Sequence, residues 1–517
     1  MVVRVLDCTL RDGGYVNSWD FGYINIENIV KNLVLSEVDF IELGFLKPCQ
    51  YNLNKTLFNR MEEFNNFVTS NVKTQFLGMI TYGQYEVDDI PLHKEGMIDG
   101  VRIIFKPTEY KKALEYCMAI KNKGYKVFIN PMHTYNYSDK ELLDLIEKAN
   151  EIKPYGVSIV DTMGIMKAKQ LLHIFNLIDY NLSLEIGVCF HSHNNLQLSF
   201  SNAQALIEAN SRRELIIDVS IRGMGRGAGN LCTELLLQYL NDGFEKKYNL
   251  IPILKTIDEQ INKIYIKHPW GYNISYYLAA SLQVHPNYAS FLTDKASISV
   301  ESMSDILSLI PDNKKSNFDE KLIQELYLKY QENEVDDSKV LDKLKSDIAD
   351  KKILVVAPGK TIIAEHEKIN NYIKQNNPFI ISINFRPQDI AVNNVFIGNA
   401  RRFSEQTNLK NVIVTSNIKT DKVSQLNYGS YLNNSEMADN SALMLLKILI
   451  KLGAKEVVFA GLDGFSSDKD NYFSLDMVNN AKLGEEFDKR NDIMSAMLKK
   501  LSRQIGIKFI TTSLYEN

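Results

Sequence analysis

The chain has 517 residues, 45% hydrophobic and 24% charged, and its 59 basic and 63 acidic residues give a formal net charge of −4. These proportions are those of a globular protein and exclude a wholly disordered chain. A general nucleic-acid-binding protein is also disfavoured, because such domains usually carry a basic surplus. No run approaches the ~20 apolar residues of a membrane-spanning helix, and no signal core follows the N-terminus. We therefore expect a cytoplasmic protein that binds neither nucleic acid nor membrane.

The five cysteines indicate buried thiols and not a disulfide framework, since none forms a CxxC pair in this long chain. They are Cys8, Cys49, Cys117, Cys189 and Cys232. All of them precede residue 233, so the C-terminal half has neither a cysteine nucleophile nor a thiolate metal site.

The first ~240 residues alternate short apolar runs with amphipathic stretches, a pattern typical of a parallel sheet with crossover helices. Eight runs at this spacing favour a (β/α)8 TIM barrel, with an open doubly wound sheet as the alternative. The candidate strands are Val2–Cys8, Asp39–Phe45, Phe76–Thr81, Gly100–Phe105, Lys126–Pro131, Gly156–Asp161, Glu185–Phe190 and Ile216–Ile221.

The pattern changes after the eighth run. We predict a barrel over residues 1–290, a helical extension and connector over 291–351, and a smaller doubly wound, Rossmann-like α/β domain over 352–517. The charged section 314–352 has leucines at helical spacing. This pattern indicates a helical connector with a solvated face, and a coiled-coil contact is the alternative. Predicted strands of the last domain are 353–357, 379–384, 394–397, 411–415, 456–460 and 508–511.

Two motifs place candidate metal ligands at predicted strand ends. The first predicted strand leads into Arg11–Tyr15, and the seventh into His191–His193. The side-chain period of a strand is two, so His191 and His193 point to one face. In a barrel the carboxyl ends of the strands form the mouth, where active sites lie. The Asp12 carboxylate and two imidazoles suit Mn²⁺, Mg²⁺, Co²⁺ or Zn²⁺. An HxH pair alone is weak evidence for a metal site. The Arg11–Tyr15 motif at another strand end strengthens the case for such a site.

Further polar residues follow other predicted strands. The loop 223–229 holds four glycines in seven residues, which lets backbone approach a ligand. Asn230 comes next, and its amide either caps the following helix or turns its oxygen toward the metal. Glu42 and Asp161 end the second and sixth strands, where a substrate contact and a structural role are both open.

Asp7–Gly13, His191–His193 and Gly227–Asn230 together resemble the DRE-TIM metallolyase superfamily in order, spacing and strand placement. Its members include 4-hydroxy-2-oxovalerate aldolase, hydroxymethylglutaryl-CoA lyase and isopropylmalate synthase. The N-terminal motifs are most similar to the first branch, and the resemblance covers about residues 1–290. It implies a metal-dependent enzyme that acts on a 2-keto acid and an aldehyde.

The resemblance also implies roles for individual residues. Asp12, His191 and His193 would hold the divalent metal, with Asn230 nearby or ligating. Mn²⁺ and Mg²⁺ are preferred over Co²⁺ and Zn²⁺ as the expected metal. The metal would bind the 2-keto and carboxylate oxygens of a pyruvate-like unit, and Arg11 would stabilise the enolate that forms when the C–C bond breaks.

One position departs from the family pattern. The related aldolases have a histidine base three residues after the metal aspartate, where this chain has Tyr15. A phenol with its usual pKa of ~10 is a poor base at neutral pH, although it can orient or protonate a hydroxyl. His133 and Tyr288 are the other candidate catalytic residues. The ordinary alternative for His133 is a hydrogen-bonded loop histidine, and for Tyr288 it is a side chain packed in the core.

The predicted C-terminal domain lacks the cysteine that an acylating aldehyde dehydrogenase needs. Its turn 357–361 is either an anion site before a helix or a turn that simply requires Gly359, and it does not have P-loop spacing. Polar residues after several strands would border a ligand crevice, as in the nucleotide-sugar folds of bacterial sialyltransferases, which the arrangement resembles. A nucleotide or sugar phosphate site there is one hypothesis, and a structural or assembly domain is the other.

Taken together, the sequence predicts a bifunctional, homo-oligomeric chain with a metal-dependent aldolase barrel. One alternative is a Claisen-type acyl-CoA lyase or synthase of the same superfamily. The other is a nucleotide- or glycan-binding protein with an inactive barrel, against which the intact Arg11, Asp12, His191 and His193 argue.

Overall fold

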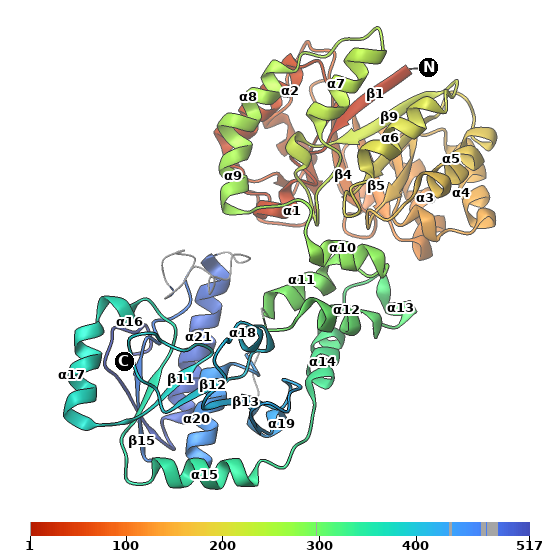
Figure 1. The fold of residues 1–517 in the computed structure, drawn as a ribbon. Helices are drawn as coiled ribbons and strands as arrows, with labels where there is room; N and C mark the ends of the chain where they lie inside the picture. Colours follow the sequence, from red (N-terminus) through yellow and green to blue (C-terminus); the bar gives the residue numbers. More distant parts are fainter. Residues whose placement is uncertain (1, 296, 434–436, 467–471, 473–483, 517) are drawn as a thin grey trace. The chain divides into compact units, whose positions relative to one another are not determined.

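The computed structural model describes residues 2–295, 297–433, 437–466, 472 and 484–516, and the chain divides into two compact units (Figure 1). The first unit is Met1–Pro286 and the second is Asn287–Asn517. The sequence-based division placed its first boundary a few residues later, after residue 290. In the described part of the chain no helix is long and apolar enough to span a membrane.

The first unit is a closed barrel of eight parallel strands, which confirms the predicted fold and removes the open-sheet alternative. The strand order is β1-β9-β8-β7-β6-β5-β4-β2, and β1 also pairs with β2, with Leu6 opposite Phe40. The strands are β1 (Val2–Asp7), β2 (Phe40–Leu46), β4 (Gln75–Thr81), β5 (Gly100–Phe105), β6 (Lys126–Pro131), β7 (Gly156–Asp161), β8 (Gly187–Ser192) and β9 (Glu214–Val219), with β3 (Leu57–Phe58) added beside β2.

Amphipathic helices cover the outside of the barrel. In α4, Leu142, Leu145, Ile146 and Ala149 are buried at helical spacing, and the Ser138 side chain caps the first turn. The helices of this unit are α1 (Gly14–Asn17), α2 (Tyr23–Leu35), α3 (Tyr110–Asn122), α4 (Asp139–Ile152), α5 (Ala168–Asn181), α6 (Ser199–Glu208), α7 (Thr233–Gly243), α8 (Ile251–Thr256), α9 (Asn262–Lys267) and α10 (Ile274–Ser281). A π-helical turn at Ile257–Ile261 joins α8 to α9. Short 3-10 turns are Met61–Asn66, Val87–Asp89, Pro107–Glu109, Thr134–Asn136 and Ile221–Gly223.

The barrel interior has an apolar layer made of side chains from several strands. This layer consists of Leu6, Cys8, Phe40, Leu77, Phe128, Cys189 and Ile216. Charged side chains lie beyond this layer, at the carboxyl ends of the strands. The mouth is therefore the polar end of the barrel.

The second unit contains a parallel seven-stranded sheet in its described residues, which confirms the predicted second α/β sheet. Its order is β14-β13-β12-β11-β10-β15-β16. The strands are β10 (Ile353–Val356), β11 (Phe379–Ile383), β12 (Asn394–Ile397), β13 (Val412–Thr415), β14 (Ser424–Leu426), β15 (Glu456–Ala460) and β16 (Gly506–Phe509). The chain order reverses between β10 and β15, the switch point of a doubly wound sheet.

Helices cover both faces of this sheet. Ile369 of α17 belongs to the core on one face, whereas Leu443 and Leu446 of α20 belong to the core on the other. The helices are α11 (Pro286–Lys295), α12 (Val300–Ser308), α13 (Asp312–Lys315), α14 (Glu320–Gln331), α15 (Ser338–Ile348), α16 (Thr361–Ala364), α17 (His366–Asn376), α18 (Ala400–Ser404), α19 (Tyr428–Tyr431), α20 (Ser441–Lys451) and α21 (Gly484–Leu501).

The helices before the second sheet pack into the second unit, where the sequence suggested a connector. Leu344 and Ile348 of α15 join the core beneath β11 and β12. The Tyr327 hydroxyl of α14 donates a hydrogen bond to Asp439. In α14 the buried residues are Ile323, Tyr327 and Gln331, whereas the leucines at helical spacing are half-buried.

The turn 357–361 is closed by a carboxylate of the protein itself. The Thr361 N–H donates to Asp463 Oδ2 at 2.9 Å, and the Thr361 hydroxyl donates to the same carboxylate. A Cβ on Gly359 would lie 2.4 Å from the Gly461 carbonyl oxygen, so this close approach requires glycine. Of the two sequence interpretations, the geometry favours a turn that needs its glycine.

Candidate metal centre

Three buried side chains converge at the barrel mouth. Asp12 lies in the loop after β1, His191 lies on β8, and His193 follows two residues later on the same face. Each offers a ligand atom, and these atoms lie within 4.8 Å of one another. His191 Nε2 is 4.0 Å from Asp12 Oδ1, and His193 Nδ1 is 3.9 Å from Asp12 Oδ2. The structure thus brings the three predicted ligands together.

A carboxylate behind His191 fixes how its ring faces the centre. Asp218 Oδ2 on β9 lies 2.9 Å from His191 Nδ1, so Nδ1 carries the proton and the lone pair of Nε2 is left for a metal. The pKa of Asp218 is held below its usual value by Arg102 and His191 despite complete burial. This carboxylate therefore stays charged and orients the ligand.

The charges continue as a buried chain across the mouth. Arg102 of β5 donates hydrogen bonds to Asp218 and, at 3.1 Å, to Glu42 Oε2. The same Glu42 oxygen accepts the Nε–H of Arg11 at 2.7 Å, and Arg11 donates to Asp12 Oδ1 at 2.6 Å. Buried ions are tolerated only when paired. Each carboxylate here has at least one guanidinium partner, so the mouth holds a connected set of five charged groups.

Two buried atoms at the centre lack a hydrogen-bond partner among the described residues. They are His193 Nδ1 and Asn230 Oδ1. Leaving a buried polar atom unpaired costs about 1–3 kcal/mol, and a cation at this point would remove that cost. The pKa of His193 is lowered to about 3, chiefly by burial, so its ring is a neutral ligand at physiological pH. The pKa of Asp12 is held well below its usual value by Arg11 and the two histidines, overcoming burial. The donor set therefore fits a divalent cation.

Asn230 contacts the centre and does not cap α7. Its amide Nδ2 donates to Asp12 Oδ2 at 2.7 Å and to the Met224 carbonyl at 3.1 Å. The residue at the N-cap of α7 is Cys232. A Cβ on Gly225 would lie 2.3 Å from Asn230 Nδ2, which explains why glycine is needed in this loop. The helix-cap interpretation is thus wrong, and contact of the Asn230 oxygen with a metal stays a prediction.

The other predicted catalytic residues of the barrel lie near Arg226. The Arg226 guanidinium is 5.7 Å from the centre of the Tyr15 ring, and Tyr15 remains 43% exposed. Desolvation raises the pKa of Tyr15, and Arg226 offsets this only in part. Burial, assisted by Arg226, lowers the pKa of His133 to about 4. His133 Nδ1 lies 2.9 Å from the Tyr135 hydroxyl. At neutral pH, Tyr15 is thus a proton donor and His133 a neutral imidazole.

Tyr288 lies in the second unit, in α11, and its side chain is fully buried. Its hydroxyl contacts the Lys314 and Asn317 carbonyls at 3.0 and 2.8 Å and accepts the Asp319 N–H at 3.1 Å. Its hydroxyl is therefore occupied by backbone of its own unit, and a catalytic role for Tyr288 stays a prediction.

Sequence reasoning did not identify Arg102 and Asp218. The signal was present, because each is a charged residue within an otherwise apolar stretch of its strand, and a buried charge needs a partner. Asp161, by contrast, accepts the N–H groups of Ile165 and Met166, which is a structural role. Glu42 turns out to hold Arg11.

Comparison with known proteins gives matches to the barrel unit. The family model HMGL-like matches residues 105–258. A 4-hydroxy-2-oxovalerate aldolase from Geobacillus genomosp. 3 is 28% identical over 263 residues, 50% of this chain and 76% of that protein. An oxaloacetate decarboxylase from Mycobacterium tuberculosis is 24% identical over 238 residues, 46% of this chain and 69% of that protein.

A solved structure supports the same relationship. The crystal structure of the N-terminal domain of a candidate aldolase from Bacteroides vulgatus is 27% identical, with a TM-score of 0.50. The match covers 56% of this chain and 95% of that domain. The HMGL-like match, the 4-hydroxy-2-oxovalerate aldolase relatives and the closed barrel together support membership of the N-terminal unit in the DRE-TIM metallolyase superfamily.

Proposed function

We propose that the barrel is a divalent-metal-dependent aldolase that cleaves or forms the C–C bond between a pyruvate enolate and an aldehyde. The observation that carries this proposal is the buried cluster of Asp12, His191 and His193 with the Arg11 guanidinium paired to it. Mn²⁺ or Mg²⁺ is the metal we expect from the family resemblance, and one carboxylate with two imidazoles is also a suitable ligand set for Co²⁺ or Zn²⁺.

A bound divalent ion would act as a Lewis acid on the 2-keto and carboxylate oxygens of the substrate. Arg11 supplies a second positive charge at the same place. Because Glu42 holds its Nε–H and Asp12 one of its terminal N–H groups, the guanidinium is fixed before the reaction starts. A preorganised cation stabilises the enolate oxygen where its charge develops.

Cleavage of a 4-hydroxy-2-keto acid requires removal of the hydroxyl proton while the C3–C4 bond breaks. The bonding pair passes into the enolate, the hydroxyl carbon becomes the aldehyde, and a proton then adds to C3 to give pyruvate. Neutral His133 is able to accept a proton through Nε2 in the tautomer whose Nδ1–H donates to the Tyr135 hydroxyl. The raised pKa of Tyr15 suits it to donate a hydrogen bond or return the proton.

The named relatives support the enolate as the common element. Aldol cleavage of 4-hydroxy-2-oxovalerate and decarboxylation of oxaloacetate both break the bond beyond C3 of a 2-keto acid and leave a pyruvate enolate. The aldehyde used by this chain is not fixed by that comparison. The predicted cytoplasmic location and homo-oligomeric state stay predictions.

The test is metal content and pyruvate release measured on the same preparations of the full chain. We expect near-stoichiometric divalent metal and pyruvate release from 4-hydroxy-2-keto acids, both lost in the His191→Ala/His193→Ala variant. His173→Ala is the matched control, because His173 is an exposed histidine paired with Asp139 on the barrel surface.

Two outcomes would contradict the proposal. Release of carbon dioxide from oxaloacetate with no cleavage of any hydroxy-keto acid would identify a decarboxylase. Release of free CoA from an acyl-CoA substrate would identify the Claisen-type alternative.

A further inference from the structure

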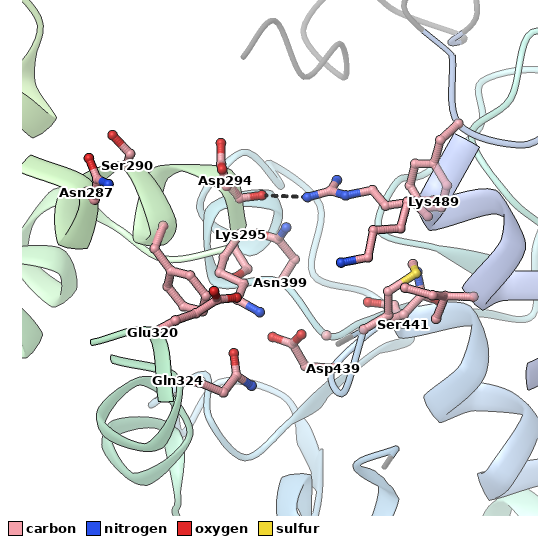
Figure 2. A pocket seen from close by; sticks show the side chains of 18 of the residues that line it. Asn287, Ser290, Asp294, Lys295, Glu320, Gln324, Asn399, Asp439, Ser441 and Lys489 are labelled. Carbon is pink, nitrogen blue, oxygen red and sulfur yellow. Dashed lines mark hydrogen bonds between the residues drawn. The ribbon is translucent and has the colours of Figure 1, made fainter. Parts of the chain in front are cut away.

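The second unit holds a pocket of about 1500 Å³ at the carboxyl edge of its sheet (Figure 2). Residues that follow β10, β11, β12 and β15 line the pocket, together with α11, the segment 314–324, the start of α20 and α21. Ligands of open α/β sheets bind outside the carboxyl ends of the strands, where the chain order reverses. That reversal lies between β10 and β15. Pro358, which follows β10, and Phe465, which follows β15, both line the pocket.

A fixed polar network lies where β11 and β12 end. Asn384 has a φ of 63°, and its side chain accepts the Gly398 N–H and donates to Ser441 Oγ, each at 3.1 Å. A Cβ on Gly398 would lie 2.7 Å from Ser441 Oγ. The glycine therefore allows the start of α20 to approach the strand ends, so that this part of the lining is held in place before any ligand binds.

Basic side chains from separate elements line the same pocket. Among the lining residues Lys and Arg number six against four Asp and Glu. Lys314 is paired with Asp319 and Arg402 with Glu405. Figure 2 shows Lys489 extending from α21 into the pocket. Neighbouring Arg490 donates to the Asp294 backbone carbonyl at 3.2 Å and has no carboxylate partner among the described residues. A cation whose neighbour is a neutral carbonyl is suited to bind phosphate oxygens.

The remaining lining residues favour a ligand with hydroxyl groups and a flat ring. Six side-chain amides face the pocket, and amides both donate to and accept from neighbouring hydroxyls. Phe291, Phe318 and Phe465 are also among the lining residues, and aromatic side chains pack favourably against a flat ring. Small-molecule sites usually measure ~300–1000 Å³, so this pocket has room for a ligand of two joined parts.

From these features we propose that the pocket binds a sugar carried on a phosphate ester, either as a sugar phosphate or attached through phosphate to a nucleoside. Lys489 and Arg490 bind the phosphate oxygens. Asn384 and Ser441, at the sheet edge, bind sugar or ribose hydroxyls. The proposal goes beyond the aldolase chemistry and rests only on residues of the second unit.

Isothermal titration calorimetry of the full chain tests this proposal. The probes are UDP-N-acetylglucosamine, CMP, UDP, glucose 1-phosphate, unphosphorylated N-acetylglucosamine and inorganic phosphate. We expect at least one phosphate ester to bind roughly tenfold or more tighter than both inorganic phosphate and the free sugar, as one additional charge-assisted contact provides. Binding of glucose 1-phosphate without binding of the nucleotides would indicate a sugar phosphate. Binding of the nucleotides without binding of glucose 1-phosphate would indicate a sugar attached through phosphate to a nucleoside.

The variants are Lys489→Met and Ser441→Ala, with Lys499→Met as the matched control because Lys499 is an exposed lysine on the same helix. We expect Lys489→Met and Ser441→Ala each to bind the phosphate ester roughly tenfold more weakly. Lys489→Arg should keep its affinity for the ester, and the affinity of Lys499→Met should not change. An unchanged far-UV circular dichroism spectrum and thermal unfolding profile of the full chain verify that the variants fold. The proposal is overturned if no probe binds at millimolar concentration, if inorganic phosphate binds as tightly as every ester, or if Lys489→Met and Lys499→Met behave alike.

Discussion

The two parallel sheets of this chain carry polar groups at their carboxyl ends in opposite ways. In the barrel, Arg11, Glu42, Arg102 and Asp218 are at most 3% exposed and pair with one another behind the candidate ligands. In the second unit, Lys489 and other basic side chains line a wide pocket.

The difference follows from sheet closure. A closed barrel directs all its strand ends at one axis, so charged groups meet at hydrogen-bonding distance and exclude water, as a metal site needs. An open sheet has space only where its chain order reverses, and that space suits a larger, hydrated ligand. The comparison predicts that changes at the barrel mouth cost far more than changes at the pocket.

The largest effect is expected for Asp12→Asn. It removes the only carboxylate of the ligand set while keeping the shape of the side chain. We expect loss of bound metal and a fall in pyruvate release of roughly 10³-fold or more, since metal polarisation contributes several kcal/mol to the transition state. Elemental analysis and a lactate dehydrogenase-coupled assay measure the two quantities. Asp139→Asn, at an exposed carboxylate, is the control. Full activity with metal still bound would rule out the mechanism.

Next comes Arg102→Met, which tests the buried charge chain. The variant leaves Glu42 and Asp218 without their shared cation, and breaking a buried ion pair in this way costs about 3–5 kcal/mol. Both tryptophans of the chain, Trp19 and Trp270, lie in the first unit, so their fluorescence in a urea titration follows the barrel alone.

The exposed Arg212→Met serves as its control, with an expected change within about 0.5 kcal/mol. Equal unfolding free energies for the two variants would show that the chain of charges does not stabilise the barrel.

Arg11→Lys separates catalysis from metal binding. Lysine keeps the charge and loses the planar fork that contacts Glu42 and Asp12 together. We expect kcat to fall about 10²–10³-fold, the usual effect of losing one preorganised donor, while metal content and KM change little. A variant that loses metal and activity in parallel would instead make Arg11 a residue that positions Asp12.

The barrel was predictable from sequence because its evidence is local. Apolar runs recur at regular spacing, and the period of two in a strand already places His191 and His193 on one face. The orientation of His191 was not predictable in this way. It depends on Asp218 and Arg102, which are 116 residues apart and meet only when the sheet closes.

The second unit shows the same limit. The apolar strands β10 to β13 and β15 were found within one or two residues, whereas β14 was missed because Ser424–Leu426 has little apolar character. The turn at Thr361 looked like an anion site because Asp463, which closes it, is 102 residues away. Local patterns therefore identify elements, and long-range partners decide what a strand end can bind.

The smallest effect we expect is on pH dependence, at the mouth outside the metal ligands. The pKa of His133 falls from 6.5 to about 4 on folding, so between these values the unfolded chain binds a proton that the folded barrel does not. The unfolding free energy therefore decreases as the pH falls through this window, by at most about 1.4 kcal/mol per pH unit for each such histidine.

In His133→Asn the unfolding free energy should decrease less steeply as the pH falls from 6.5 to about 4. Above pH 6.5 its dependence on pH should be unchanged. Asparagine is suitable because residue 133 has a left-handed φ of 50°, which it tolerates. Tryptophan fluorescence in urea, with the metal chelated, gives the slope between pH 7 and pH 4.5, and exposed His173→Asn is the control. Because buried His193 and half-buried His285 have lowered pKa values too, a residual slope should persist in the variant. A slope identical to that of the parent chain would mean that folding does not change the pKa of His133 and would contradict its burial as a neutral imidazole.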